Sequence, residues 1–138
     1  DNQTANHGAL MTRVSEAIAY FDRLLASPSI SALAQTTLFT ASDFGRTLTS
    51  NGDGTDHGWG SHHLVVGGAV RGRDIYGRYP VIGVNADDDV GQGRLLPSVS
   101  VDQYGATLAR WFGLSDGDID MVFPNIRNFG VRNLGFLA

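Results

Sequence analysis

The sequence predicts an α/β fold in which a sheet is flanked by helices, and three patterns predict it. An amphipathic segment near the start of the chain has helical spacing, a β-branched segment after it has the composition of a buried strand, and a capping-box motif opens a second helix near residue 100. With 138 residues, 42% of them hydrophobic, the chain can form one core, so we expect a single domain over residues 1–138. The order helix, strand, loop, strand and helix is typical of layered α/β proteins.

The first helix is expected over residues 5–26, because apolar residues recur there three or four positions apart. Pro28 ends the helix, since proline lacks the backbone N–H and biases the residue before it away from helical geometry. The expected buried stripe consists of Leu10, Val14, Ile18, Phe21 and Leu25.

Two strands are expected, over residues 36–41 and 63–66, with a long loop between them. The first segment is β-branched and aromatic, and its end delivers Asp43. The loop over residues 45–60 contains the turn dipeptides Asn51-Gly52 and Asp53-Gly54, and its length favours a functional role over mere connection. In open α/β sheets ligands bind beyond the carboxyl ends of strands, which is where this loop lies.

The second half of the chain is expected to carry brief strands near Ile75 and at residues 81–84, followed by two helices. Ser100 and Gln103 fit a capping box, so a helix should run from there to about Phe112, with Gly113 in the left-handed conformation after its end. A short helix should follow at residues 116–121, and the tail from residue 125 should be irregular. The buried stripe of the longer helix is expected to be Val101, Tyr104, Leu108 and either Trp111 or Phe112.

Composition excludes several classes of protein. Ten basic and 14 acidic residues give a net charge of -4, so no basic field attracts nucleic acid or anionic lipid. No run of apolar residues is long enough for a transmembrane segment. The absence of cysteine excludes disulfides, thiolate metal sites and a cysteine nucleophile.

Potential ligands of a metal ion and of an anion gather after the first expected strand. Asp43, Asp56 and His57 supply carboxylate and imidazole groups, which are ligands of Zn or of a similar divalent ion, with Ca as the other candidate. Arg46 offers a guanidinium fork for the oxygens of phosphate or sulfate. These groups are the types that a divalent-metal site at Asp43, Asp56 and His57 needs, with Arg46 as anion contact, in a protein acting on a small-molecule ester.

Other interpretations of these residues stay open. Asp43 and the Asp56-His57 pair are also typical of hydrogen-bonded loop anchors. His62 and His63 are weaker candidates, because neighbours in a strand point to opposite faces. Residues 51–56 fit part of a calcium-binding repeat that needs several stacked copies, and the acidic run at residues 87–89 suits either calcium or a solvated loop.

Residues 39–47 read Phe-Thr-Ala-Ser-Asp-Phe-Gly-Arg-Thr, residues 54–60 read Gly-Thr-Asp-His-Gly-Trp-Gly, and residues 100–104 read Ser-Val-Asp-Gln-Tyr. These motifs resemble those of one family, the exported proteins called domain of unknown function 1501. The resemblance extends over nearly the whole chain and includes the Val-Val-Gly-Gly run at residues 65–68 and the Leu-Leu-Pro run at residues 95–97.

This resemblance implies the C-terminal portion of an alkaline-phosphatase-like fold, in the superfamily of alkaline phosphatases and sulfatases. It also implies a twin-arginine export signal and a periplasmic or secreted location. Asp1-Asn2-Gln3 resembles the continuation of a family Asp-Thr-His motif, so we expect a fragment that lacks the N-terminal part of the same protein.

Roles follow from the resemblance residue by residue. Asp43 takes the place of the aspartate in the superfamily's strand-terminal Asp-His pair, His57 that of a later metal-binding histidine, and Arg46 that of an anion contact. Phe44 stands where that pair has its histidine, and phenylalanine cannot bind a metal, which puts one of the two metal sites in question. The nucleophile is expected upstream of this chain.

Two functions are consistent with these residues. One is a metal-dependent hydrolase of phosphate or sulfate esters, indicated by Asp43, Arg46 and His57. The other is a non-catalytic exported protein that keeps the fold for ligand binding or surface assembly, indicated by Phe44.

Overall fold

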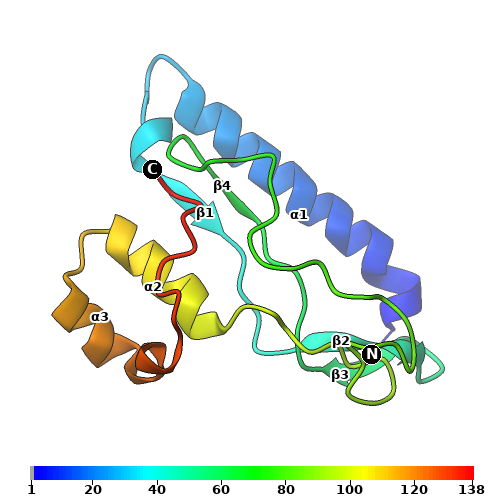
Figure 1. The fold of residues 1–138 in the computed structure, drawn as a ribbon. Coiled ribbons are helices and arrows are strands. Elements are labelled where there is room, and N and C mark those ends of the chain that lie inside the picture. Colours follow the sequence, from blue (N-terminus) through cyan, green and yellow to red (C-terminus); the bar gives the residue numbers. More distant parts are fainter. Residues whose placement is uncertain (1) are drawn as a thin grey trace. The chain divides into compact units, whose positions relative to one another are not determined.

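The computed structural model describes residues 2–138 and divides them into two compact units. Unit 1 comprises the chain up to Gly68 together with Pro80–Pro97, and unit 2 comprises Ala69–Tyr79 and Ser98–Ala138. Asp1, where the expected upstream motif would continue, lies outside the described residues. Unit 1 contains α1 (Gln3–Ala26), η1 (Leu33–Gln35), β1 (Thr37–Phe39), β2 (Gly45–Ser50), β3 (Thr55–Gly58) and β4 (Val65–Gly67), and unit 2 contains α2 (Val101–Trp111), α3 (Asp116–Val122) and η2 (Pro124–Asn128) (Figure 1).

Helix α1 confirms the expected first helix, but its apolar stripe is covered only in part. Ile18 and Leu25 are half-buried and line a shallow crevice together with Leu38. Leu10 and Val14 remain 53% and 44% exposed, and no residue of α1 is fully buried. Within unit 1 the helix therefore packs through its C-terminal half.

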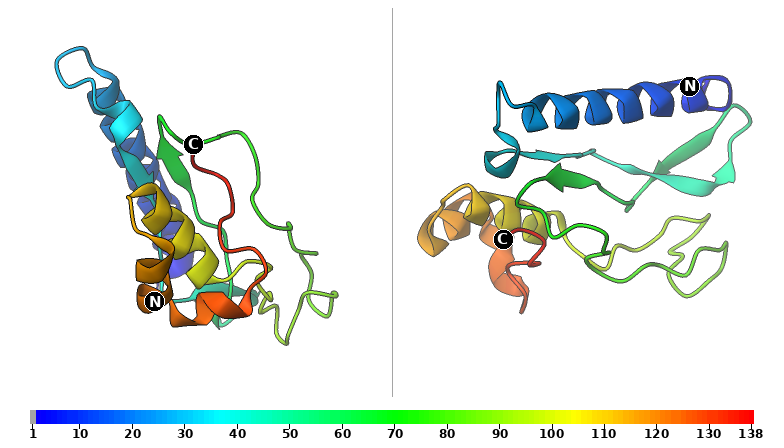
Figure 2. Two further views of the ribbon diagram at one scale, coloured as in Figure 1. Left: turned by 60° about the vertical axis from the view of Figure 1, so that its left-hand side comes forward. Right: turned by 90° about the horizontal axis from the view of Figure 1, so that it is seen from above.

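The N-terminal end of α1 is held by the turn between β2 and β3. The backbone N–H of Asn2 donates to the Asp53 carboxylate at 2.9 Å, and the backbone N–H of Thr4 donates to the Asp53 carbonyl at 2.9 Å. The Gln3 side-chain carbonyl accepts from both the backbone N–H and the hydroxyl of Thr55. Helix α1 thus runs along unit 1 from this turn to the β1–β4 pair (Figure 2).

The sheet expected from the sequence is present as two small sheets, because the strands form two separate antiparallel pairs. The expected strands at residues 36–41 and 63–66 exist as β1 and β4 and pair with each other, with Phe39 opposite Val65. Strands β2 and β3 form the second pair. The fold is mixed, with helices and small antiparallel sheets.

The loop expected over residues 45–60 is a β-hairpin, which corrects the sequence interpretation. In β2, threonines alternate with other residues, a pattern typical of a strand. The glycines around the hairpin nevertheless led to the prediction of a loop. The expected turn dipeptides do form its tip, where the backbone N–H of Asn51 donates to the carbonyl of Gly54 at 3.0 Å.

Residues 80–97 contain no regular strand, so the brief strand expected at residues 81–84 is wrong. The brief strand expected near Ile75 is also absent. Carboxylates organise this segment instead. The Asp89 carboxylate accepts backbone N–H groups from Asn85, Gly91 and Gly93 at 2.7–2.8 Å, and these bonds, that from Asn85 first, lower its pKa. Asp88 accepts the N–H of Val81 at 2.7 Å. In this arrangement both carboxylates act as loop anchors.

The same segment lies against the hairpin. The Gly93 carbonyl accepts the N–H of Leu48 at 3.1 Å, and the Leu95 carbonyl accepts the N–H of Gly60 at 3.3 Å. Gly93 has φ +74°, and a Cβ on it would lie 2.5 Å from the Cβ of Leu48. Close backbone approach at Gly93 therefore holds the segment against β2.

Helix α2 confirms the expected capping box, in which the Ser100 hydroxyl accepts the N–H of Gln103 and the Gln103 side chain accepts the N–H of Ser100. The expected stripe is wrong at Val101, which is 78% exposed, whereas Tyr104, Leu108 and Trp111 are half-buried; of the two candidates for its last position, Phe112 is the exposed one, at 81%. The buried residues of α2 are instead Gln103, Ala106 and Thr107.

The C-terminal segment explains why polar residues of α2 are buried. The Gln103 amide donates to the Val131 carbonyl at 2.6 Å, and the Thr107 hydroxyl accepts the N–H of Leu134 at 2.9 Å. These bonds give the buried side chains of Gln103 and Thr107 partners in the backbone of the C-terminal segment. Ala106 packs with Ile119 of α3 and Ile126 of η2 to form the small apolar core of unit 2.

The rest of unit 2 follows the sequence expectation except at residue 125, where the tail expected to be irregular begins with the 3-10 helix η2. Gly113 has φ +107° after α2, and α3 occupies the place of the expected short helix. Asp120, whose side chain is 24% exposed, pairs with both Arg127 and Arg132 and so links α3 to the chain that follows it. None of the helices between Asn2 and Ala138 combines the length and apolar content needed to cross a lipid bilayer.

Replacing Gly93 by alanine should destabilise the protein by about 3 kcal/mol, because the new methyl group adds overlap with Leu48 to the strain of a left-handed residue. Gly91→Ala is the matched control, since Gly91 also has positive φ, +115°, but no atom lies within 4 Å of its added Cβ. We expect that variant to lose about 1 kcal/mol. Urea unfolding measures both losses, and equal losses would contradict the packing of Gly93 against β2.

Replacing Asp120 by asparagine should destabilise the protein by about 2 kcal/mol, because it leaves two arginines of a partly buried cluster without their shared carboxylate. Asp116→Asn removes the partner of Arg110 at a side chain that is 66% exposed, and should cost less than about 1 kcal/mol. Thermal unfolding compares the two variants. A loss no larger for Asp120→Asn than for Asp116→Asn would show that the cluster does not stabilise unit 2.

Candidate functional site

The register of the β2–β3 hairpin places Arg46 directly opposite His57. Gly45 pairs with Gly58, and Arg46 with His57. A Cβ on Gly58 would lie 2.7 Å from the carbonyl carbon of Arg46, so the two strands approach more closely than a side chain at this position allows. The cation and the imidazole are therefore cross-strand neighbours on one face of the hairpin.

Phe44 completes this cluster. Its ring is stacked on the His57 imidazole, with ring centroids 3.6 Å apart and an interplanar angle of 14°. The Arg46 guanidinium carbon lies 5.2 Å from the centroid of the Phe44 ring, within the range of a cation–π interaction. We call Phe44, Arg46 and His57 the hairpin cluster.

One hydrogen bond orients the Arg46 side chain and leaves most of its donors unused. One guanidinium nitrogen, Nη1, donates to the Thr55 carbonyl at 2.7 Å, which fixes the side chain across the hairpin. A guanidinium has five N–H donors, so most of them remain for a ligand. Arg46 is exposed, and neither Arg46 nor His57 forms an ion pair among the residues that the structure describes.

Asp43 precedes the hairpin and faces solvent. The Ser42 hydroxyl donates to the Phe44 carbonyl at 2.9 Å, a bond that closes a tight turn around Asp43. Its carboxylate has no hydrogen bond or ion pair within residues 2–138. The Asp43 oxygens are thus available to a metal ion or to another partner.

Asp56 is engaged elsewhere. Its carboxylate accepts the Asn51 amide at 2.8 Å, close to the hairpin turn. Asp56 and His57 are consecutive in β3, and consecutive side chains of a strand point to opposite faces. In this structure Asp56 therefore acts as a hydrogen-bonded loop anchor, which is one of the two interpretations that the sequence left open.

His62 and His63 lie between β3 and β4, and both are exposed. The His63 Nδ1 atom lies 3.3 Å from the Thr40 hydroxyl, which also accepts the N–H of Leu64 at 2.8 Å. His63 thus takes part in closing the end of the β1–β4 pair.

The structure brings together only some of the residues singled out from the sequence. Arg46 and His57 lie together, whereas the Asp56 side chain projects from the opposite face of β3. No group of three or more His, Cys, Asp or Glu side chains in the described part of the chain is arranged to hold a metal ion. The assignment of Asp43, Asp56 and His57 as metal ligands therefore stays a prediction.

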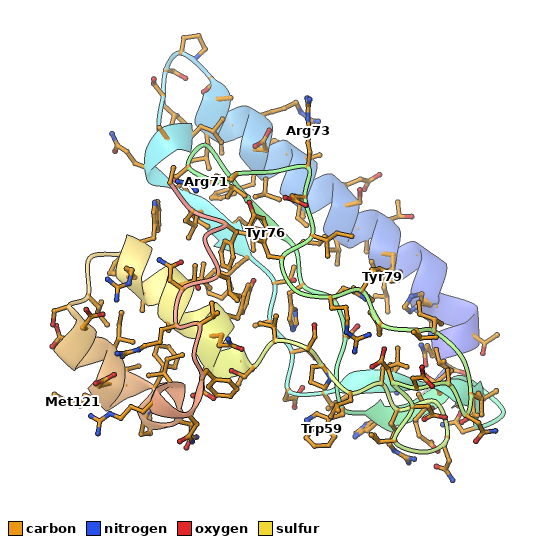
Figure 3. All side chains as sticks on the ribbon, in the orientation of Figure 1. Trp59, Arg71, Arg73, Tyr76, Tyr79 and Met121 are labelled. Carbon is orange, nitrogen blue, oxygen red and sulfur yellow. The ribbon has the colours of Figure 1, made fainter. Side chains whose placement is uncertain are left out.

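The stacking role of Phe44 was missed from the sequence. A strand alternation starting at Phe44 places it on the same face as Arg46, and this signal is hidden when residues 45–60 are interpreted as a loop. Trp59, two residues after His57, is 65% exposed and adds a further aromatic surface next to β3 (Figure 3).

The hairpin cluster has the chemistry of an oxyanion site. A guanidinium provides paired N–H donors for phosphate, sulfate or carboxylate oxygens, and an imidazole at its side can donate a further hydrogen bond or exchange a proton. The Phe44 ring excludes water from one side of the imidazole.

Comparison with known proteins gives one match. No curated protein and no solved structure shows significant similarity to the chain. The model of one family, described as "Protein of unknown function (DUF1501)", matches residues 1–120. The chain therefore belongs to the DUF1501 family.

Proposed function

We propose that this protein is a metal-dependent hydrolase of phosphate or sulfate esters, with the hairpin cluster as the part of its site that holds the ester oxyanion. The cross-strand pairing of Arg46 with His57 is the observation that carries the proposal. The resemblance of the motifs to the alkaline-phosphatase and sulfatase superfamily supports it. An alkaline-phosphatase-like fold, a twin-arginine signal and a periplasmic or secreted location belong to the same proposal.

Arg46 would bind two non-bridging oxygens of the ester group, since its fork matches their spacing. Its bond to the Thr55 carbonyl orients the fork before the ligand arrives. This preorganisation favours binding, because less side-chain freedom is lost when the ester binds.

A divalent ion, Zn or Ca, would supply Lewis-acid polarisation of the ester oxygen. Asp43 fits the role of ligand, since its carboxylate has no other partner among the described residues. His57 fits through the ring edge that Phe44 leaves open. Asp56 fits less well, because it points to the other face of β3 and accepts a hydrogen bond from Asn51. The set within this chain is incomplete for a closed site, and no nucleophile is assigned to it.

Replacing His57 by alanine should abolish bound metal and turnover of an aryl phosphate or aryl sulfate in the intact protein. Asp43→Asn should act in the same direction. His7→Ala is the matched control, because it removes an exposed histidine of α1 in the same unit. Elemental analysis and a chromogenic assay measure both quantities. Metal content unchanged by His57→Ala would count against the metal site.

Arg46→Lys should lower kcat/KM about 10- to 100-fold, since a point charge replaces a bidentate fork. Arg94→Lys is a control for the same exchange, because within the described part of the chain the Arg94 side chain bonds only inside its own loop. Steady-state kinetics with both esters checks the result, and an equal effect of the two variants would remove Arg46 from the site.

The second candidate is a non-catalytic protein that binds an oxyanion ligand. Phe44 favours it, because by resemblance it stands where the superfamily has a metal-binding histidine, and its ring instead stacks on His57 at 3.6 Å. In this case inorganic sulfate should shift the NMR signals of the His57 ring in protein freed of metal, and Arg46→Gln should remove the shift. Metal-dependent turnover would exclude this candidate.

A further inference from the structure

A concentration of arginine in unit 2 has no role in the proposed hydrolase site. Residues 69–79 contain three basic residues, Arg71, Arg73 and Arg78, and one acidic residue, Asp74. The chain has ten basic and 14 acidic residues in total, so the remainder carries seven basic and 13 acidic ones. A segment of net charge +2 therefore stands in a chain whose other residues sum to -6. We call residues 69–79 the arginine strip.

The backbone of the arginine strip is fixed at both ends. Near its start, Val70 forms a β-bridge with Leu137, and the N–H of Arg71 donates to the Phe136 carbonyl at 2.9 Å. Near its end, the N–H of Arg78 donates to the Ser98 hydroxyl, which itself donates to the Arg78 carbonyl. The strip thus presents its side chains from a defined backbone.

Tyr76 holds the middle of the strip. Its hydroxyl donates to the Arg71 carbonyl at 2.8 Å, and its ring packs edge-on against Phe136 with centroids 5.7 Å apart. Tyr79 is 54% exposed, so a large part of its ring faces solvent. Figure 3 shows Arg71, Arg73, Tyr76 and Tyr79 following one another along the segment.

The guanidinium groups of Arg71 and Arg73 have no partner within residues 2–138. Both residues are exposed, and neither forms an ion pair or a side-chain hydrogen bond there. In the same unit the arginines at positions 110, 127 and 132 are each paired with an aspartate. The difference leaves two forks, on residues two positions apart in an anchored segment, available to the oxyanions of a ligand.

We propose that the arginine strip binds an anionic polysaccharide. Guanidinium forks bind sulfate or carboxylate oxygens in pairs, and two unpaired forks on one anchored segment can meet two charged groups of a polymer. The exposed ring of Tyr79 offers an apolar face for a sugar ring. This inference goes beyond the proposed hydrolase and needs neither its metal nor the hairpin cluster.

Charge favours a polysaccharide over nucleic acid. Duplex DNA carries one negative charge for about every 1.7 Å of its axis, and proteins that bind it present many cations. The arginine strip has a net charge of +2, but the other residues of the chain sum to -6. These acidic residues would repel so dense a polyanion. A polysaccharide with one charged group per one or two sugars places fewer charges against the acidic remainder.

The test is binding of kappa-carrageenan, with one sulfate per two sugars, and of polygalacturonate, with one carboxylate per sugar, to the whole protein at low salt, with neutral dextran and duplex DNA as comparisons. The first polymer carries sulfate and the second carboxylate, so the pair identifies the anionic group. The variant Arg71→Gln/Arg73→Gln should weaken binding about tenfold and lower the salt dependence by about two charges. Both side chains lack folded-state partners, so circular dichroism should show an unchanged fold.

The matched control is Arg13→Gln/Arg23→Gln, which removes the same charge from exposed, unpaired arginines of α1. It should weaken binding less than twofold, and Tyr79→Ala should weaken it without changing the salt dependence. Equal weakening by both double variants, tighter binding of DNA than of either polysaccharide, or no binding by the unaltered protein would overturn the proposal. Metal content and ester turnover are unaffected by these outcomes, so the hydrolase proposal is tested separately.

Discussion

The β2–β3 register is the constraint on which the candidate site depends. Gly45 and Gly58 lie opposite each other, and side chains at these positions would collide with the backbone of Gly60 and Arg46, respectively. Because a strand's side chains alternate between faces, a shift of one residue in the pairing would separate Arg46 from His57. Glycine at positions 45 and 58 thus allows the pairing that places Arg46 beside His57.

The surroundings of the hairpin reinforce this register from two sides. Asp53 and Thr55 hold the start of α1 at one end, and the Gly93 carbonyl bonds to the middle of β2. Arg46 then spans the hairpin to the Thr55 carbonyl, and Phe44 covers one face of His57. The resulting cluster is rigid in its backbone and polar at its open edge, which suits recognition of an oxyanion more directly than it suits closed coordination of a metal.

Local patterns predicted much of the fold, and long-range contacts account for the rest. Helix α1 and the Ser100–Gln103 capping box follow from spacing and hydrogen-bonding chemistry within a few residues. The hairpin was taken for a loop because its glycines are used for close approach between strands, which composition does not distinguish from use in a turn. Burial of Gln103 depends on the Val131 carbonyl, 28 positions away, and no pattern within the helix reveals that partner. For the site, residue type identified Arg46 and His57, but only the register shows that they meet, and that Asp56 faces away.

A crystal structure of the protein soaked with tungstate, an oxyanion located by its anomalous scattering, tests the central claim most directly. The account predicts tungstate oxygens within about 3 Å of the Arg46 guanidinium, on the face of the hairpin that carries His57 and Phe44. Tungstate bound only at other surfaces, or a hairpin in which Arg46 and His57 occupy opposite faces, would contradict it.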